Sequence, residues 1–394
     1  MSSELTVDWQ RRWQSSVMNT YGTPSLALVY GEGINVFDTE GRRFVDFTGG
    51  IAVNTLGHRH PAIIRAVSEQ VGRLCHTSNL FMTPGVVELA ERLTAHLAQP
   101  AKAFFCNSGT EANEAALKIS RRTGRPKIVA AEGGFHGRTL GALSVTGQPA
   151  KQDPFTPLLP DVQFVPYGDS AALERAVDDR TAAVVLEPIL GEGGIVVPPA
   201  GYLSQARRIT REYGSLLVLD EVQTGVARTG SFFAHEREGI DPDVVTLAKG
   251  LAGGLPIGVC LATEGAADLL QPGDHGATFG GNAVSVAAAH AVLDEIDSAG
   301  LVDHAAQIGR MLRTSIEHLQ HPMVASVRGA GLLIGLELSS ATAGKVVQLA
   351  RDSGYLLNAA TPNVVRLAPP LIVTSDDVQR FVSCLPAILD RVVK

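Results

Sequence analysis

One lysine stands apart from the others by its position in the sequence. The chain has seven lysines, and only Lys249 directly follows an apolar run, Asp-Val-Val-Thr-Leu-Ala, and leads into the glycine-rich segment Gly-Leu-Ala-Gly-Gly-Leu-Pro. Such a position can remove an amine from water, lower its pKa and make it nucleophilic toward an aldehyde. The simpler interpretation is a lysine that extends from a strand end into solvent, which is common. Lys249 is therefore a candidate Schiff-base lysine whose role depends on its neighbours.

Asp220 occupies a similar place at the end of another apolar run, Ser-Leu-Leu-Val-Leu. Open α/β sheets bind their ligands at the carboxyl ends of strands. A buried acid needs a cationic partner. A protonated pyridine nitrogen is such a partner, and the carboxylate in turn keeps the ring protonated as an electron sink. Alone, Asp220 fits a magnesium ligand or a helix cap equally well, but a strand-end aspartate followed by a strand-end lysine and glycines is much more specific.

The segment Asn107–Glu111 joins a short apolar run to an amphipathic helix pattern. Helix N-termini present free backbone amides, so Ser108, Gly109 and Thr110 are candidates for holding a phosphate. Ser108 and Glu111 also have the spacing of a capping box, which needs no ligand, and both interpretations can hold together. No Gly-x-x-x-x-Gly-Lys-Ser/Thr or Gly-x-Gly-x-x-Gly motif follows a strand here, which weakens ATP and dinucleotide alternatives.

The run Phe-His-Gly-Arg-Thr at 135–139 is a weaker signal. Phe135 offers an aromatic face to a flat heterocycle, and the guanidinium of Arg138 can hold a carboxylate through two parallel hydrogen bonds. Most phenylalanines and arginines belong to cores and surfaces. The run supports a site only together with Asp220 and Lys249.

These residues require an α/β core to position them. From about residue 100 onward, short apolar runs alternate with amphipathic stretches, which is typical of a mainly parallel sheet with helices on both faces. A helix is expected over 111–122, with alanines and Ile119 on one face. The expected strands are 103–106, 127–131, 182–186, 216–219, 244–247 and 259–262.

After Val292 the pattern changes to that of a smaller α+β domain. A long helical stretch is followed by a helix near 343–353 and a strand around 364–367. The domains expected are a segment of the small domain at 1–48, a large domain at 49–292 and the rest of the small domain at 293–394. Without a repeat or a long linker, the two domains should pack tightly.

Composition argues against several classes of function. A chain of 394 residues is long enough for two domains with a ligand site between them, and a net charge of -7 without basic stripes argues against nucleic acid. The longest uncharged run, 276–293, is interrupted by polar residues and glycines, so no membrane span is expected. The start has neither a secretory nor a mitochondrial leader pattern, which predicts a cytoplasmic protein. The four scattered cysteines fit buried thiols, with no metal site and no disulfides.

Taken together, the motifs resemble those of the class-III aminotransferases. They are Asn-Ser-Gly-Thr-Glu-Ala-Asn-Glu from 107, Phe-His-Gly-Arg-Thr from 135, Glu-Pro-Ile-Leu-Gly-Glu-Gly-Gly from 187, Leu-Asp-Glu-Val-Gln-Thr-Gly from 219, Leu-Ala-Lys-Gly from 247 and His-Gly-Ala-Thr-Phe-Gly-Gly-Asn from 275. The resemblance runs from about Tyr21 to Leu371 in one order. It implies an aspartate-aminotransferase-like fold (fold type I), pyridoxal 5'-phosphate as cofactor, a homodimer with a shared active site, and a small domain built from both chain ends.

The resemblance also implies a role for each motif residue. Lys249 would carry the cofactor as a Schiff base, Asp220 would pair with its ring nitrogen, and Gln223 would bind its ring hydroxyl. Phe135 would stack on the ring. The other cofactor-binding residues implied are Ser108, Gly109, Thr110, Glu221 and Val222, with Thr278 reaching the phosphate from the partner subunit.

Substrate-binding roles follow from the same resemblance. Arg138 and Arg366 would be carboxylate clamps, and Glu192 is expected to neutralise Arg366 in one half-reaction and move away in the other. Ala277 stands where the family commonly has serine, and Leu190 where glutamine is usual. Both departures leave the central chemistry in place, but they can shift substrate affinity.

Within the family, the runs around His58 and Asn79 are most similar to members that act on N2-acetylornithine with 2-oxoglutarate, a step of arginine biosynthesis. Ornithine and 4-aminobutyrate aminotransferases are the nearest alternatives. Ornithine enzymes have a tyrosine where this chain has Ile51, so a polar contact for free ornithine is missing. A pyridoxal-phosphate aminomutase and a non-enzymatic binding protein are more distant alternatives, and an intact Lys249 disfavours the latter.

Overall fold

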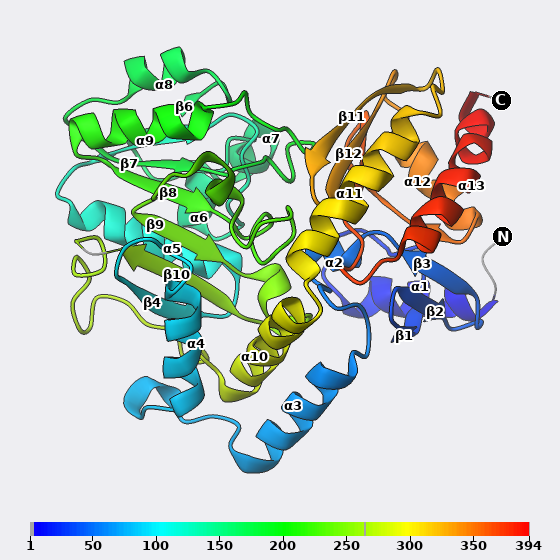
Figure 1. Ribbon diagram of the computed structural model, residues 1–394, viewed down its shortest axis with the longest axis horizontal. Coiled ribbons are helices and arrows are strands. Elements are labelled where there is room, and N and C mark those ends of the chain that lie inside the picture. Colours follow the sequence, from blue (N-terminus) through cyan, green and yellow to red (C-terminus); the bar gives the residue numbers. More distant parts are fainter. Residues whose placement is uncertain (1–3, 264, 394) are drawn as a thin grey trace.

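A computed structural model describes residues 4–263 and 265–393. Two lobes lie side by side, and the first and last helices of the chain lie in the same lobe (Figure 1). The large lobe is built on a seven-stranded sheet of order β4-β10-β9-β8-β7-β5-β6, in which β10 is antiparallel to both of its neighbours and the other pairings are parallel. Its strands are β4 (Ala101–Cys106), β5 (Lys127–Ala131), β6 (Val162–Val165), β7 (Thr181–Leu186), β8 (Leu216–Asp220), β9 (Val244–Leu247) and β10 (Gly258–Thr263).

Helices cover both faces of this sheet, as the pattern predicts. Because successive side chains of a strand point to opposite faces, Ile128 of β5 packs with the α5 face and the adjacent Val129 packs with α8 and α9. The helices of this lobe are α2 (Gly49–Ala52), α3 (Pro61–Arg73), α4 (Pro84–Thr94), α5 (Gly109–Arg122), α6 (Leu140–Ser144), α7 (Pro149–Gln152), α8 (Ser170–Ala176), α9 (Tyr202–Tyr213) and α10 (Ala283–Ser298), with 3-10 turns η1 (Ser78–Leu80), η2 (Asp153–Phe155), η3 (Ala234–Glu238) and η4 (Lys249–Ala252).

The small lobe contains two four-stranded sheets. One sheet, of order β1-β2-β3-β13, joins the beginning of the chain to a late strand through the parallel pairing of β3 with β13. The other has the order β11-β12-β15-β14. The elements are α1 (Glu4–Ser16), β1 (Leu28–Glu32), β2 (Asn35–Asp38), β3 (Arg43–Asp46), α11 (Leu301–Glu317), β11 (Val324–Ala330), β12 (Leu333–Leu338), α12 (Ala343–Asp352), β13 (Tyr355–Leu356), β14 (Asn358–Thr361), β15 (Val364–Leu367) and α13 (Ser375–Val393).

The expected strands of the core are confirmed within two residues at each end, whereas β6 and the N-terminal strands β1 to β3 were not expected. The expected boundary at 292–293 falls inside α10. The expectation of four buried thiols is wrong for Cys75 and Cys384, which are exposed.

Across residues 4–263 and 265–393, no helix is long and apolar enough to cross a membrane, and no group of three or more His, Cys, Asp or Glu is placed to hold a metal ion.

Candidate active site

The sequence motifs converge on one cavity at the carboxyl ends of β8 and β9, beside the start of α5. The cavity has a volume of about 400 Å³, which lies in the range of small-molecule sites. Nine of the residues singled out from the sequence line it: Ser108, Gly109, Thr110, Phe135, Arg138, Asp220, Val222, Gln223 and Lys249. The parallel strands bring these separate segments together, because their carboxyl ends meet at one edge of the sheet.

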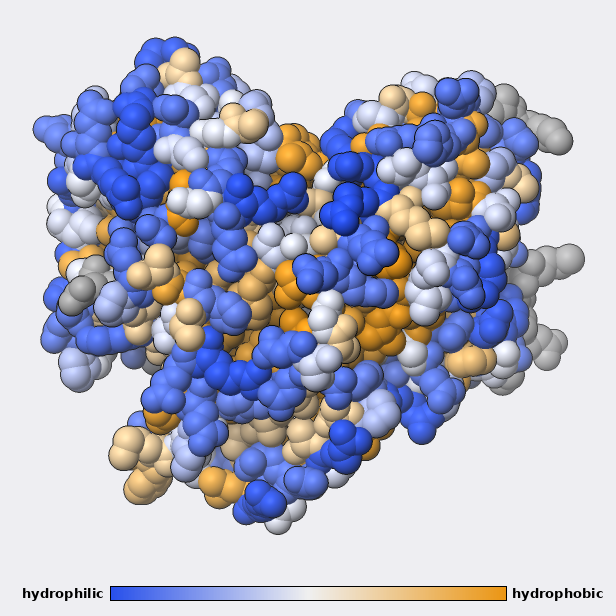
Figure 2. All heavy atoms as spheres, viewed as in Figure 1, coloured by the Kyte–Doolittle hydropathy of each residue, from blue (hydrophilic) through white to orange (hydrophobic). Residues whose placement is uncertain are grey.

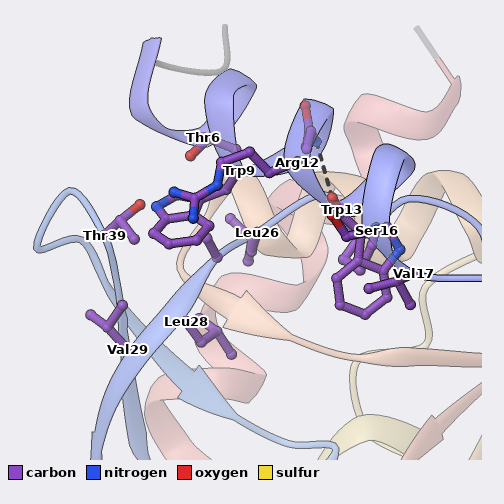
Figure 3. Close-up of a pocket in the computed structure, with 13 residues that line it drawn as sticks. Thr6, Trp9, Arg12, Trp13, Ser16, Val17, Leu26, Leu28, Val29 and Thr39 are labelled. Atoms are coloured by element: carbon purple, nitrogen blue, oxygen red, sulfur yellow. Dashed lines mark hydrogen bonds between the residues drawn. The ribbon is translucent and has the colours of Figure 1, made fainter.

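Size alone does not identify this site. A larger cavity of about 510 Å³ lies between α1 and β1, where Trp9 and Trp13 project from the helix toward the segment that carries Leu26 and Leu28 (Figure 3). None of the motif residues lines it. The chemistry of the lining residues therefore favours the cavity of Lys249 and Asp220.

Asp220 is buried, and both of its carboxylate oxygens accept hydrogen bonds. Its Oδ2 accepts hydrogen bonds from Asn113 (2.8 Å) and His136 Nδ1 (2.7 Å), and its Oδ1 accepts one from the amide of Val222 (3.0 Å). Burial acts to raise the pKa of Asp220, but the hydrogen bond and charge of His136 outweigh it and hold this pKa below its ordinary value. Burial acts to lower the pKa of His136, but the hydrogen bond and charge of Asp220 outweigh it and raise this pKa. The carboxylate is thus ionised, and the protein itself supplies part of the cationic partner that a buried acid needs.

Two further buried polar residues, His136 and Glu187, also line the cavity, and reasoning from the sequence assigned them no role. The two oxygens of Glu187 accept hydrogen bonds from the amides of Phe135 and Gly191, both at 2.9 Å. Burial raises the pKa of Glu187 to about 7. His136 Nε2 is buried without a hydrogen-bond partner among the described residues. The only signal for these roles was the presence of His136 and Glu187 within the quoted motifs.

Lys249 follows β9 after one intervening residue, Ala248, and its backbone is in the left-handed region, with φ of 36°. A non-glycine residue in this region is strained, and such strain concentrates at functional sites. Burial lowers the pKa of the Lys249 ammonium, and the charge of Arg366 acts in the same direction while that of Glu192 opposes it. The side chain lines the cavity, so its amine is placed to act as a nucleophile there.

The start of α5 forms one wall of the cavity and has the predicted cap. The Ser108 hydroxyl accepts a hydrogen bond from the amide of Glu111 (3.4 Å), and the Glu111 carboxylate accepts one from Ser108 (2.7 Å). A Cβ on Gly109 would lie 2.7 Å from the Val222 methyl groups, so only glycine fits this close approach. The first turn of α5 thus keeps its amides open to the cavity, as a phosphate would require.

Arg366 and Glu192 meet as an ion pair at the same site. Arg366 is 2% exposed, and its Nη1 donates to Glu192 Oε1 (2.5 Å) and to Gln223 Oε1 (3.0 Å). Its Nη2 donates to Asn358 (2.8 Å). Burial acts to raise the pKa of Glu192, but the charge of Arg366 outweighs it, and the pKa is lowered. The pairing expected from the family resemblance is therefore present in this conformation.

A lysine to which the sequence analysis gave no role lies beside Phe135, one of the residues that line the cavity. Lys151 was interpreted as an ordinary loop lysine, yet its ammonium lies 5.7 Å from the centre of the Phe135 ring, the same distance as the guanidinium of Arg138. Burial lowers the pKa of Lys151, and the charge of Arg138 adds to this effect. Two cations therefore flank one aromatic ring.

Five predicted site residues are not among those that line the cavity: Glu192, Glu221, Ala277, Thr278 and Arg366. Glu192 and Arg366 adjoin it, because Arg366 donates to the lining residue Gln223 and pairs with Glu192. The Glu221 carboxylate is buried elsewhere, where it accepts hydrogen bonds from the amides of Ala234 and His235, both at 3.0 Å. We therefore do not assign the Glu221 carboxylate to the cofactor, because its two oxygens already accept hydrogen bonds inside the protein. Ala277 and the exposed Thr278 lie outside the lining of this chain's own cavity.

Comparisons with known proteins identify the family of this chain. The family model described as aminotransferase class-III matches residues 17–389. The acetylornithine aminotransferase of Mycolicibacterium smegmatis is 61% identical over 381 residues, which cover 97% of this chain and 98% of that protein. The acetylornithine aminotransferase of Streptomyces coelicolor is 57% identical over 391 residues, which cover 99% and 96%.

Solved structures agree as well. The ornithine aminotransferase from Toxoplasma gondii matches with a TM-score of 0.94 and 30% identity, covering 100% of this chain and 96% of that one. The acetylornithine aminotransferase from Elizabethkingia anophelis matches with a TM-score of 0.88 and 33% identity, covering 98% and 99%. These likenesses confirm the aspartate-aminotransferase-like fold. Because the match in sequence and in structure spans nearly the whole chain, the chain belongs to the class-III aminotransferase family.

Proposed function

We propose that this aminotransferase uses pyridoxal 5'-phosphate to move the ω-amino group of N2-acetylornithine to 2-oxoglutarate, giving N-acetylglutamate 5-semialdehyde and glutamate. The observation that carries the proposal is the convergence of Lys249, whose pKa is lowered, and an ionised Asp220 on one cavity. Relatives named acetylornithine aminotransferase support the substrate. A cytoplasmic location remains part of the proposal and rests on the sequence alone.

The residues of the cavity fit the cofactor. The amides of Gly109 and Thr110 would hold its phosphate, Phe135 would face its ring, and Asp220 would hold a proton on its ring nitrogen. Gln223 accepts from Arg366 through its oxygen, which leaves its amide nitrogen to donate to the ring hydroxyl. When bound, pyridoxal phosphate supplies an aldehyde that captures amines and a ring that withdraws electrons.

Lys249 has two tasks in this proposal. Its lowered pKa favours the neutral amine, which is the form that attacks an aldehyde. Once a substrate amine has replaced it, Lys249 Nζ can accept a proton from the carbon that bears that amine and later return it. Asp220 acts differently, because its hydrogen bonds hold a negative charge in one place throughout the reaction.

Arg366 and Glu192 address the two unlike substrates. Glutamate carries a carboxylate close to its reacting amine, whereas acetylornithine carries a carboxylate only at its far end. We propose that Glu192 neutralises Arg366 while acetylornithine reacts, and moves aside when the α-carboxylate of glutamate arrives. Glu192 lies between Gly191 and Gly193, a setting with backbone freedom. Arg138 would then hold the far carboxylate of either substrate.

A donor panel tests the substrate. The purified enzyme, loaded with cofactor, is given N2-acetylornithine, ornithine or 4-aminobutyrate at equal concentration with 2-oxoglutarate. Acetylornithine should give the highest kcat/KM, because the exposed Ile51 offers no polar contact to free ornithine. A higher kcat/KM with ornithine or 4-aminobutyrate would overturn the substrate assignment. Product formation from acetylornithine without 2-oxoglutarate would instead indicate an aminomutase.

The proposal includes a homodimer with a shared active site. The segment between α3 and α4 projects at the lower left of Figure 1 and carries apolar side chains at its tip in Figure 2. Leu80, Phe81 and Met82 in this segment are 84%, 70% and 90% exposed, and Phe279, next to Thr278, is 58% exposed. Such a patch is typical of an interface. A partner that covers it would bring its own Thr278 to the phosphate of this chain.

Hybrid dimers test this sharing. A wild-type chain paired with a Lys249→Ala chain keeps one intact site, whereas a chain with both Lys249→Ala and Thr278→Ala leaves no intact site in the hybrid. Weaker cofactor retention in the second hybrid is the expected result. Equal retention in both hybrids, or a monomer in analytical ultracentrifugation, would contradict the shared site. The division into 1–48, 49–292 and 293–394 also stays a proposal, supported by the pairing of β3 with β13.

A further inference from the structure

A second polar cavity lies where the two lobes meet. It has a volume of about 300 Å³ and is lined by Arg237 from η3 of the large lobe and by Arg310 and Arg313 from α11 of the small lobe. Much of the remaining wall comes from residues 229–231 and 329–331. None of its lining residues lines the cavity of Lys249. We call this cavity the arginine cleft.

Few carboxylates lie close enough to neutralise the arginines of this cleft. Among residues 4–263 and 265–393, Arg237 and Arg310 form no ion pair and no side-chain hydrogen bond, and Arg313 reaches Glu317 only at 4.0 Å. Glu238, next to Arg237, is held by the amide (3.0 Å) and hydroxyl (3.1 Å) of Ser204. The cleft therefore concentrates positive charge in a chain whose net charge is -7.

An exposed arginine elsewhere in the large lobe shows the contrast. Arg208 of α9 lies 2.7 Å from Glu174 and 3.1 Å from Glu212. Its charge is thus neutralised within the chain. The cleft differs because three cations from two lobes converge on a space that no side chain fills.

Close backbone packing holds the walls of the cleft in place. A Cβ on Gly309 of α11 would lie 1.9 Å from the carbonyl oxygen of Gly331, and a Cβ on Gly230 would lie 2.7 Å from the Ala306 side chain. The helix therefore lies directly on both backbone segments. In addition, the amide of Leu332 donates to the carbonyl of Arg228 (2.9 Å). The arginines are thus presented from a rigid frame, which lowers the entropic cost of binding.

We propose that the arginine cleft binds a phosphoryl anion, either inorganic phosphate or the phosphate group of a small metabolite. Guanidinium groups match phosphate oxygens through paired, charge-assisted hydrogen bonds. A volume of about 300 Å³ is at the lower end of small-molecule sites, which suits one or two phosphoryl groups. Because Arg237 and Arg310 belong to different lobes, an anion bound between them stabilises the packing of the lobes. The inference does not depend on the proposed substrate.

Titration calorimetry with pyrophosphate tests the proposal. The protein is first saturated with pyridoxal phosphate, so that the phosphate position in the cavity of Lys249 is filled, and ionic strength is held constant with sodium chloride. One pyrophosphate per chain is expected to bind and to raise the midpoint of thermal unfolding. Arg237→Ala and Arg310→Ala should each weaken binding by about tenfold. Arg208→Ala is the matched control and should bind as the wild type does.

Three results with pyrophosphate would overturn the proposal. They are an absence of binding at millimolar pyrophosphate, binding of unchanged strength in the Arg237→Ala, Arg310→Ala double variant, and binding that disappears when pyridoxal phosphate is present. Citrate and inorganic phosphate form the comparison arms. Phosphate or pyrophosphate binding more tightly than citrate supports the phosphoryl assignment, and citrate binding as tightly would overturn it. Both arginines are exposed, so the variants should fold, which circular dichroism checks.

Discussion

The two carboxylates beside Lys249 are held in different ways. Asp220 is 4% exposed and accepts hydrogen bonds from three donors on three segments. The Glu192 side chain is 26% exposed and is held, among the described residues, by Arg366 alone, in a turn between two glycines. A charge that must stay in place through both half-reactions is buried and multiply bonded. The charge of Glu192, which must leave Arg366 in one half-reaction, is half-buried and bonded to a single partner. The predictions below test this contrast.

The largest effect is expected from Lys249→Ala. Turnover should fall by about 10⁴-fold or more, because the variant loses both the nucleophile and the proton carrier. The fold should survive, since the residue has no hydrogen-bond role in the core. Steady-state assays and circular dichroism check both points, with the exposed Lys102→Ala as control. Activity within tenfold of wild type would end the assignment of Lys249.

Asp220→Asn tests the fixed half of the site. The variant keeps the size of the side chain but removes the negative charge that would hold a proton on the ring nitrogen, so proton abstraction should slow by about 10²-fold or more. Single-turnover measurement of the absorbance change on adding acetylornithine reports this step. A rate equal to that of wild type would mean that Asp220 is not the ring partner.

His136→Asn tests what keeps Asp220 charged. Because the pKa of His136 is raised by folding, this residue stabilises the fold below its unfolded pKa, and the stabilisation is lost as pH rises through the folded pKa. Because the pKa of Asp220 is lowered by folding, this residue stabilises the fold above its unfolded pKa, and the stabilisation is lost as pH falls through the folded pKa. The pair therefore stabilises most between about pH 4 and pH 6.5. The variant should lose about 2 kcal/mol of unfolding free energy at pH 6.

The difference between wild type and His136→Asn should shrink as pH rises through the raised pKa of His136. Denaturant unfolding at several pH values measures it. Burial raises the pKa of Glu187 to about 7 while the charge of His136 acts to lower it, so the titration of Glu187 differs between the two proteins and adds to the measured difference. A difference that is constant from pH 5 to pH 9 would show that the pair is not ionised.

Glu192→Ala tests the movable half. Without its partner, Arg366 stays exposed to substrate, which should favour glutamate and impair acetylornithine. The ratio of kcat/KM for the two half-reactions should change by about tenfold for each ~1.4 kcal/mol of coupling lost. Both half-reactions can be measured separately from the absorbance of the bound cofactor. Equal changes in the two would make Glu192 a structural residue.

The smallest effect is expected from Lys151→Ala. Lys151 lies beside Phe135 together with Arg138, so its loss should raise KM about threefold for both substrates with little change in kcat, as expected for a distant charge near a carboxylate. Arg138→Ala should raise KM much more. A fall in kcat without a change in KM would show that Lys151 acts in the chemistry instead.

The sequence by itself determined the class of enzyme, all strands of the large sheet except β6, and the first members of the site. Lys249 and Asp220 each follow a short apolar run, and a strand end is a local property that the pattern of residues records. The cap of α5 at Ser108 was readable for the same reason, since a capping box involves residues three apart. Features that depend on nearby residues in the chain, such as strand ends and helix caps, could therefore be predicted from the sequence.

Only the tertiary structure decided how the site is held. His136 and Asn113 meet Asp220 from 84 and 107 residues away, and no pattern along the chain indicates either contact. Glu221 is adjacent to Asp220 in sequence, yet its carboxylate turns to Ala234 and His235. Neighbouring residues at a strand end point in opposite directions, and a buried polar group takes whichever partner the packing brings near. The residue types in the sequence indicate which chemistry is available, and the packing of distant segments decides which side chains carry it out.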